Sequence, residues 1–200
     1  MSNTRRHILQ VALRLFIRSG YRDVTFQRLI EEAGVSKGSF YHYWSGKLEL
    51  FREVVEYFFF NYFRSFQYSR DDATLGDALE GMAADFQNMV EELFELVGPE
   101  ENPFGYYLLV LEALRLFPDL QSSMSTEYQR FIDELTLVAR RAQEAGEITD
   151  RISARAIAEL IIPEVEGTAL IVFIWQEEDF AGAMQRRLRS LYNLLTARPS

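Results

Sequence analysis

The chain has 200 residues, 48% hydrophobic and 26% charged, so it can bury a core and lacks the composition of a disordered protein. It contains no cysteine, which excludes a disulfide framework, a thiolate metal site and a cysteine nucleophile. No apolar run reaches the roughly 18–20 residues that a membrane-spanning helix needs, and the first residues have no signal-peptide pattern. We therefore expect a soluble, cytoplasmic protein with no membrane partner.

The net charge of −9 is unevenly distributed along the chain. Residues 1–50 hold eight basic and four acidic residues, a net charge of +4, and they include both lysines. The remaining residues carry a net charge of −13. This asymmetry predicts that any polyanion is bound by the first 50 residues.

Helical periodicity runs through nearly the whole sequence, and no alternating strand pattern is present. Gly20 and Gly34 are placed to end helices, Thr25 and Ser36 are placed to cap them, and Pro163 should bend the helix that contains it. We predict an all-α protein of about nine helices: an N-terminal three-helix helix-turn-helix DNA-binding domain and a C-terminal helical bundle for ligand binding and dimerisation. The expected helices cover about residues 4–19, 25–33, 36–43, 45–66, 75–97, 104–117, 119–145, 153–177 and 179–196.

The helices over residues 25–33 and 36–43, joined by a glycine turn and preceded by a supporting helix, are typical of a helix-turn-helix DNA reader. The second helix of such a unit enters the major groove with its N-terminal residues. Phe40 and Trp44 lie four residues apart and should pack inward, which leaves the other side chains on the outer surface. Seen alone, such a hairpin can also be purely structural.

The stretch from about Arg5 to Val55 resembles the DNA-binding domain of the TetR (tetracycline-repressor) family of bacterial transcription regulators. The resemblance rests on the twelve residues from Ala33 to Trp44, AGVSKGSFYHYW, with Lys47 and Leu50 following at the family's spacing. Two departures, Trp44 where the family usually has Phe and Ile30 where it usually has Ala, bear on packing and helix angle.

The resemblance implies a homodimer that binds a palindromic operator in double-stranded DNA, most often as a repressor released by a small, largely apolar effector. The DNA-binding domain is then residues 1–50, and the effector-binding and dimerisation domain is residues 51–200. By position, the resemblance implies DNA contacts from Thr25, Gln27, Lys37, Gly38, Ser39, Tyr41, His42, Tyr43 and Lys47.

In this family the last two helices pair across a two-fold axis, so the helices over residues 153–177 and 179–196 are assigned that role. The alternative is that their apolar faces are the internal core of one chain. The expected interface residues are Val165, Ala169, Val172, Phe173, Met184, Leu188, Leu191, Tyr192 and Leu195.

Aromatic residues surround the helix over residues 45–66 and begin the helix over residues 104–117, and the resemblance implies an effector site in this part of the chain. With nearby apolar residues they could wall a cavity, and a carboxylate in it would favour a cationic ligand. The alternatives are core packing for the aromatics, and solvation or pairing with arginine for the acids. The expected pocket residues are Phe59, Tyr62, Phe63, Phe86, Met89, Phe104, Tyr107, Glu112, Phe131, Glu166 and Trp175.

The sequence has no phosphate-binding loop, no Gly-x-Ser-x-Gly elbow and no dinucleotide fingerprint, and its two histidines both lie in the first 50 residues. We therefore expect no enzymatic activity, no catalytic residue, no metal site and no cofactor. The rival interpretation is a helical bundle that binds a small molecule or acts as an enzyme and merely carries a structural hairpin. Salt-dependent DNA affinity separates the two interpretations.

Overall fold

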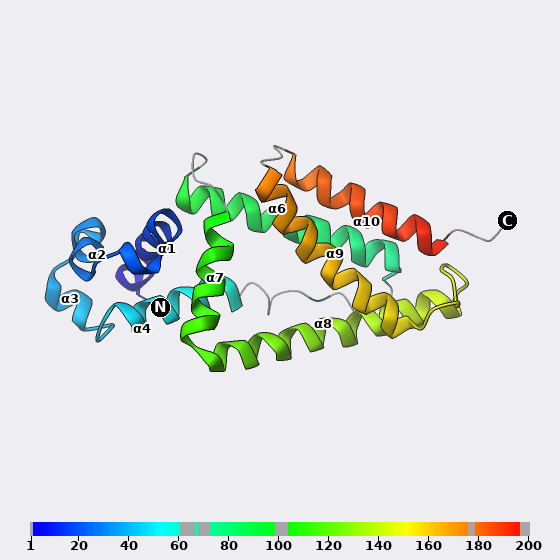
Figure 1. Cartoon of the computed structure of the whole chain (residues 1–200), viewed down its shortest axis with the longest axis horizontal. Coiled ribbons are helices and arrows are strands. Elements are labelled where there is room, and N and C mark those ends of the chain that lie inside the picture. Colours follow the sequence, from blue (N-terminus) through cyan, green and yellow to red (C-terminus); the bar gives the residue numbers. More distant parts are fainter. Residues whose placement is uncertain (1, 61–66, 68–72, 99–103, 176–178, 197–200) are drawn as a thin grey trace. The chain divides into compact units, whose positions relative to one another are not determined.

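The computed structural model describes residues 2–60, 67, 73–98, 104–175 and 179–196 (Figure 1). These residues form α-helices and no strand, which confirms the predicted fold class. By contacts the chain divides into two compact units, residues 1–64 with 91–123 and residues 65–90 with 124–200. The helices are α1 (Asn3–Asp23), α2 (Phe26–Ala33), α3 (Lys37–Tyr41), α4 (Lys47–Val55), the π-helical turn η1 (Glu56–Phe60), α6 (Leu75–Val97), α7 (Phe104–Leu116), α8 (Pro118–Glu144), α9 (Ala154–Trp175) and α10 (Phe180–Thr196).

The first three helices begin close to the predicted residues, but α1 runs four residues beyond its predicted end at residue 19 and α3 ends at Tyr41, two residues before its predicted end. Gly20 has a φ of 74° and interrupts α1 three residues before its end. Thr25 and Ser36 cap α2 and α3, because each hydroxyl accepts a hydrogen bond from the backbone N–H three residues on, at 3.1 and 3.0 Å. Gly34 ends α2 in the left-handed conformation, with a φ of 63°.

Aromatic side chains make up much of the core of the first unit. Phe16 of α1 and Phe51 of α4 meet edge to face with ring centroids 5.1 Å apart, and both are buried. Helix α7 packs on α1 and on α4 (Figure 1). At its beginning Gly105 lies so close to α1 that an added Cβ would stand 2.6 Å from the carbonyl oxygen of Ile17. The first unit therefore joins the three N-terminal helices to α4 and α7.

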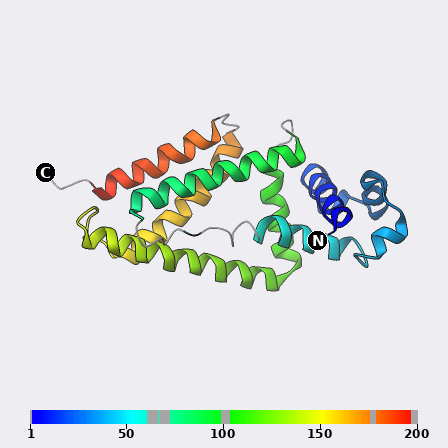
Figure 2. The same cartoon turned by 180° about the vertical axis from the view of Figure 1, so that it is seen from behind.

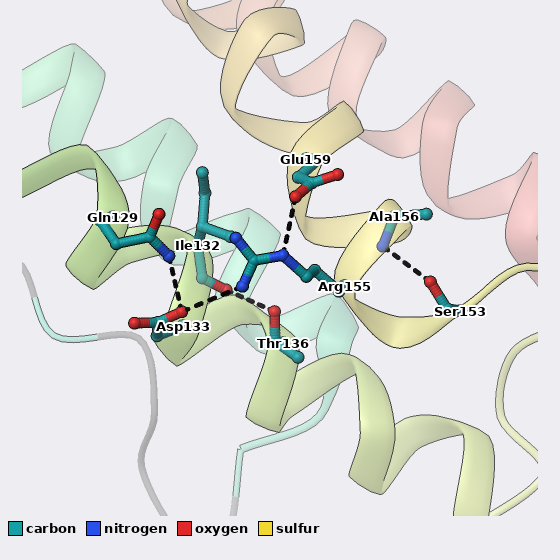
Figure 3. Close-up of polar contacts among 8 residues, drawn as sticks. All are labelled: Gln129, Ile132, Asp133, Thr136, Ser153, Arg155, Ala156 and Glu159. Carbon is teal, nitrogen blue, oxygen red and sulfur yellow. Dashed lines mark hydrogen bonds and ion pairs between the residues drawn. The ribbon is translucent and has the colours of Figure 1, made fainter. Parts of the chain in front are cut away.

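In the second unit α9 and α10 pack against each other, and the first turns of α6 run beside α10 (Figure 2). Leu135 of α8, Ile157 of α9 and Met184 of α10 are fully buried. A polar contact on the surface joins α8 to α9, where the Arg155 guanidinium donates to Glu159 at 2.8 Å and to Asp133 at 3.4 Å (Figure 3). Both acids are exposed, so this contact adds little stability.

One predicted helix differs in detail from the observed one. The helix expected over residues 45–66 is α4 followed by the π-helical turn η1, and residues 61–66 lie outside the described part. Helix α9 continues past Pro163 to Trp175, as predicted, and the bend expected at the proline stays a prediction. The functional division after residue 50 stays a prediction.

Candidate nucleic-acid interface

Helix α3 is held by its apolar side and exposes the rest of its surface. Phe40 and Trp44 are buried, as predicted, and their rings lie 5.4 Å apart. The side chains expected to contact DNA, Lys37, Ser39 and His42 among them, are exposed around Gly38. The structure therefore brings the predicted contact residues of α3 to one solvent-facing end of the first unit.

Tyr41 is the large apolar group on this surface, and half of its area is exposed. Its ring lies 5.1 Å from the ring of Phe26 in α2, and the Lys37 ammonium stands 5.9 Å from its centroid. The ring is therefore supported from behind while its free side remains open. An aromatic face beside an ammonium group suits a sugar–phosphate backbone.

The beginning of α2 contributes the two other predicted contacts, and both are exposed. Thr25 uses its hydroxyl as the helix cap, and the Gln27 amide donates to Glu31 at 2.8 Å. At the end of α3, Tyr43 is half-buried and its hydroxyl lies 3.0 Å from the Ser2 hydroxyl. Any DNA contact by Gln27 or Tyr43 would therefore share or replace a hydrogen bond that the side chain makes within the chain.

Lys47 differs from the expectation of a cation free to bind phosphate. Its ammonium donates to the backbone carbonyls of Tyr21, Arg22 and Val24, at 2.8, 3.4 and 2.7 Å, and lies 4.3 Å from the centre of the Tyr21 ring. Burial lowers the pKa of Lys47, and Asp23 opposes that shift. These hydrogen bonds fasten the last turn of α1 and Val24 to the beginning of α4, and the predicted DNA contact of Lys47 stays a prediction.

Two glutamates one turn apart on α4 hold consecutive residues that follow α3. One carboxylate oxygen of Glu53 accepts from the Trp44 indole at 2.6 Å and from the Arg5 guanidinium at 2.8 Å. Glu49 accepts from the hydroxyl and the backbone N–H of Ser45, both at 2.7 Å. These hydrogen bonds, the hydroxyl's before the backbone's, lower the pKa of Glu49. The sequence interpretation missed both acids, although a buried tryptophan in place of phenylalanine signals a need for an acceptor.

The predicted dimer interface stays a prediction. Five of its side chains are buried within a single chain, where α9 and α10 pack together, which favours the alternative of an internal core for them. Val165, Leu191 and Tyr192 are half-buried, and the side chain of Phe173 lies outside the described part. The five buried residues are Ala169, Val172, Met184, Leu188 and Leu195.

Among the predicted pocket residues of the first unit, Glu112 differs from the expectation of a carboxylate that faces a cationic ligand. Glu112 does not stand free in an apolar cavity: it accepts from Arg115 at 2.8 and 2.7 Å and lies 3.5 Å from Arg22, and the Arg115 hydrogen bonds lower its pKa. Phe59 is buried and Tyr107 is half-buried. Other predicted pocket members, Tyr62, Phe63 and the side chain of Phe104, lie outside the described residues.

Among the pocket residues of the second unit, Glu166 has the most unusual environment. Its carboxylate accepts from the Tyr128 hydroxyl at 2.9 Å, and burial raises its pKa by more than this hydrogen bond lowers it. Phe86 and Phe131 are buried and Met89 is half-buried. Trp175 is 67% exposed at the end of α9, and its place in a cavity wall stays a prediction.

Exposed apolar side chains follow one face of α9. Leu160, Leu170 and Ile174 are 54%, 37% and 56% exposed, and their spacing with Pro163 and Gly167 places all five on one side of the helix. On α10, a further leucine, Leu194, is 74% exposed. In the described ranges no group of histidines and acids could hold a metal ion, and none of the helices there is both long and apolar enough to cross a bilayer.

Comparison with known proteins matches the N-terminal helices to one family. Residues 8–54 match the model of the bacterial regulatory proteins of the tetR family. The chain is 42% identical over 53 residues to the transcriptional regulator AcrR of Shigella flexneri. The matched stretch covers 26% of this chain and 25% of that protein. It is 22% identical over 166 residues to the transcriptional repressor DhaR of Mycobacterium sp. strain GP1, 83% of this chain and 80% of that one.

The wider matches extend the likeness to the whole fold. A transcriptional regulator from Saccharomonospora viridis, solved in complex with choline, superposes with a TM-score of 0.72 at 18% identity over 99% of this chain and 100% of that one. The chain spans 25% to 63% of the length of four curated relatives that it matches. The relatives and neighbours named here are regulators of transcription and not enzymes.

Proposed function

Because the chain belongs to the TetR family of bacterial transcription regulators, we propose that it binds double-stranded operator DNA through α3 and regulates transcription, in the usual case by repression, inside the bacterial cytoplasm. The exposed end of α3 carries the proposal: Lys37 and Tyr41 stand open to solvent while Phe40 and Trp44 anchor the opposite side. The positive charge of residues 1–50 supports it, since phosphate contacts dominate DNA affinity.

The experiment is selection from a random-sequence duplex pool with the full-length chain, followed by affinity measurements on the selected duplex. Tyr41→Ala is expected to weaken that affinity by about tenfold or more, because a supported aromatic contact is lost. Arg151→Ala, which removes an exposed cation of the second unit, serves as the matched control and should bind normally. Enrichment of no sequence by the wild-type chain would refute the proposal.

A homodimer that reads a palindrome is the second part of the proposal. The two α3 helices of a dimer must reach half-sites about 34–36 Å apart, or a multiple of that. The exposed apolar face of α9, with Leu160, Leu170 and Ile174, supports a self-association surface, because large exposed apolar patches mark interfaces.

The dimer is tested by sedimentation equilibrium. Leu160→Glu is expected to shift the chain toward monomers, since a charge would be buried at the contact. Leu137→Glu is the control, because Leu137 has a similar exposure of 52% but lies on α8. A strictly monomeric wild-type chain, or equal association of both variants, would contradict this assignment.

The effector that we assign to the second unit is a largely apolar cation. A desolvated carboxylate gains from a positive neighbour, and Glu166 with Tyr128 provides such a group. The choline complex of the Saccharomonospora regulator supports this ligand class. Tetraphenylphosphonium is the probe: it should raise the melting temperature of the wild-type chain and not that of Glu166→Gln.

Glu164→Gln is the matched control for the effector experiment. Glu164 lies two residues before Glu166 on α9. Unlike Glu166, it pairs with Arg187 at 3.6 Å, and its side chain is 37% exposed. This variant should keep the response to tetraphenylphosphonium. A response that survives in Glu166→Gln, or is absent from the wild-type chain, would contradict a cation site at Glu166.

A further inference from the structure

Glu53 connects Trp44, which lies between α3 and α4, to two helices of the first unit. It lies on α4, and one of its carboxylate oxygens accepts from the indole N–H of Trp44 at 2.6 Å and from the guanidinium of Arg5 at 2.8 Å. Arg5 belongs to α1 and its guanidinium lies 5.9 Å from the Trp44 ring. A single side chain therefore fixes the end of the α3 segment to α4 and α1 together.

The burial of Trp44 makes this acceptor necessary. The residue is 1% exposed, so water cannot replace Glu53 as the partner of its indole N–H. An unpaired buried donor costs more free energy than the hydrogen bond itself contributes. Phenylalanine at this position would need no acceptor, because its ring has no polar atom.

A second acid of α4 reinforces the same connection. Glu49, one turn before Glu53, holds the hydroxyl and the backbone N–H of Ser45, the residue after Trp44. Two consecutive residues between α3 and α4 are thus bound by two consecutive turns of α4. The orientation of α3 is set by side chains of α4 as well as by the apolar core.

We propose that Glu53 is a positioning residue for DNA recognition: by holding the Trp44 indole it fixes the angle at which α3 meets the operator. This inference rests on the proposed function. It is separate from a direct charge effect, because loss of the negative charge of Glu53 would strengthen attraction to DNA, whereas loss of the positioning contact weakens binding to the specific site.

The test uses the full-length chain, the duplex that the wild-type chain selects and a scrambled duplex of the same length and composition. Glu53→Leu and Trp44→Phe are each expected to weaken binding to the selected duplex by about tenfold, with no loss of binding to the scrambled duplex. Glu53→Gln keeps a carbonyl acceptor and should stay within about threefold of wild type. In the Glu53→Leu background, Trp44→Phe should add almost nothing, because the pair acts as a unit.

The outcomes separate the possible failures. Equal weakening by Glu53→Leu and Glu53→Gln would assign the effect to the lost ion pair with Arg5, because glutamine keeps an acceptor for the Trp44 indole, and would overturn the inference. Additive effects of Glu53→Leu and Trp44→Phe would overturn it as well. Circular dichroism checks that each variant is folded. If Glu53→Leu does not fold, the affinities of Trp44→Phe and Glu53→Gln for the selected duplex test the inference. If the wild-type chain selects no duplex, the proposed function itself fails; if it does and the variants bind normally, only the role of Glu53 is refuted.

Discussion

Replacement of Gly105 by alanine tests the close approach of α7 to α1. The new Cβ would stand 2.6 Å from the carbonyl oxygen of Ile17 and 3.0 Å from its Cγ2. The first of these atoms belongs to the backbone and cannot rotate away, so one of the two helices must shift. Overpacking of this kind costs about 1–3 kcal/mol, and the helix propensity of alanine returns at most about 1 kcal/mol.

For a chain of this size each kcal/mol shifts the melting temperature by about 2–4 °C. With a mid-range cost of about 2 kcal/mol and a return of about 0–1 kcal/mol, Gly105→Ala should lower the melting temperature by roughly 2–8 °C. Gly81→Ala is the matched control: Gly81 lies inside α6, no atom stands within 4 Å of its added Cβ, and the variant should melt slightly higher than wild type. Thermal melts followed by circular dichroism, with urea titrations beside them, measure both. A Gly105→Ala variant that melts at or above wild type would refute the close packing of α7 on α1.

Two further predictions concern charged groups. Lys47→Met removes the three hydrogen bonds to the backbone carbonyls of Tyr21, Arg22 and Val24, so both the unfolding midpoint in urea and the affinity for the selected duplex should fall. A loss of affinity with an unchanged midpoint would show that the ammonium serves phosphate alone. Burial raises the pKa of Glu166 above its ordinary value of 4.5, so the folded chain keeps this proton to higher pH than the unfolded chain. The stabilisation that the protonated Glu166 carboxyl adds to the free energy of unfolding is complete below pH 4.5, and it declines as the pH rises through the folded-state pKa. Glu166→Gln should therefore gain stability relative to wild type as the pH rises above 4.5, and a difference that does not change with pH would contradict the raised pKa.

Local chemistry made the helices of the first unit predictable. Gly34 ended α2 where predicted and Gly20 interrupted α1, because glycine adopts a positive φ without steric cost. Thr25 and Ser36 capped α2 and α3 through hydrogen bonds that span three residues. Phe40 and Trp44 packed inward because residues four apart share a helix face.

The errors arose where a second helix decides the outcome. Helix α9 is apolar on more than one face, so periodicity alone could not show that Ala169 and Val172 pack inside the chain while Leu160 and Ile174 face outward. The acceptors of Lys47 lie more than twenty residues earlier in the sequence. Such contacts depend on how helices approach each other, and a single sequence does not specify that approach.

The most direct measurement is the affinity of the full-length chain for its selected duplex across a salt series. Phosphate contacts by the basic N-terminal unit predict a steep negative slope of log affinity against log salt, which Lys37→Ala should make shallower by about one. Affinity that is the same at all salt concentrations, or no binding at low salt, would contradict DNA recognition by this chain.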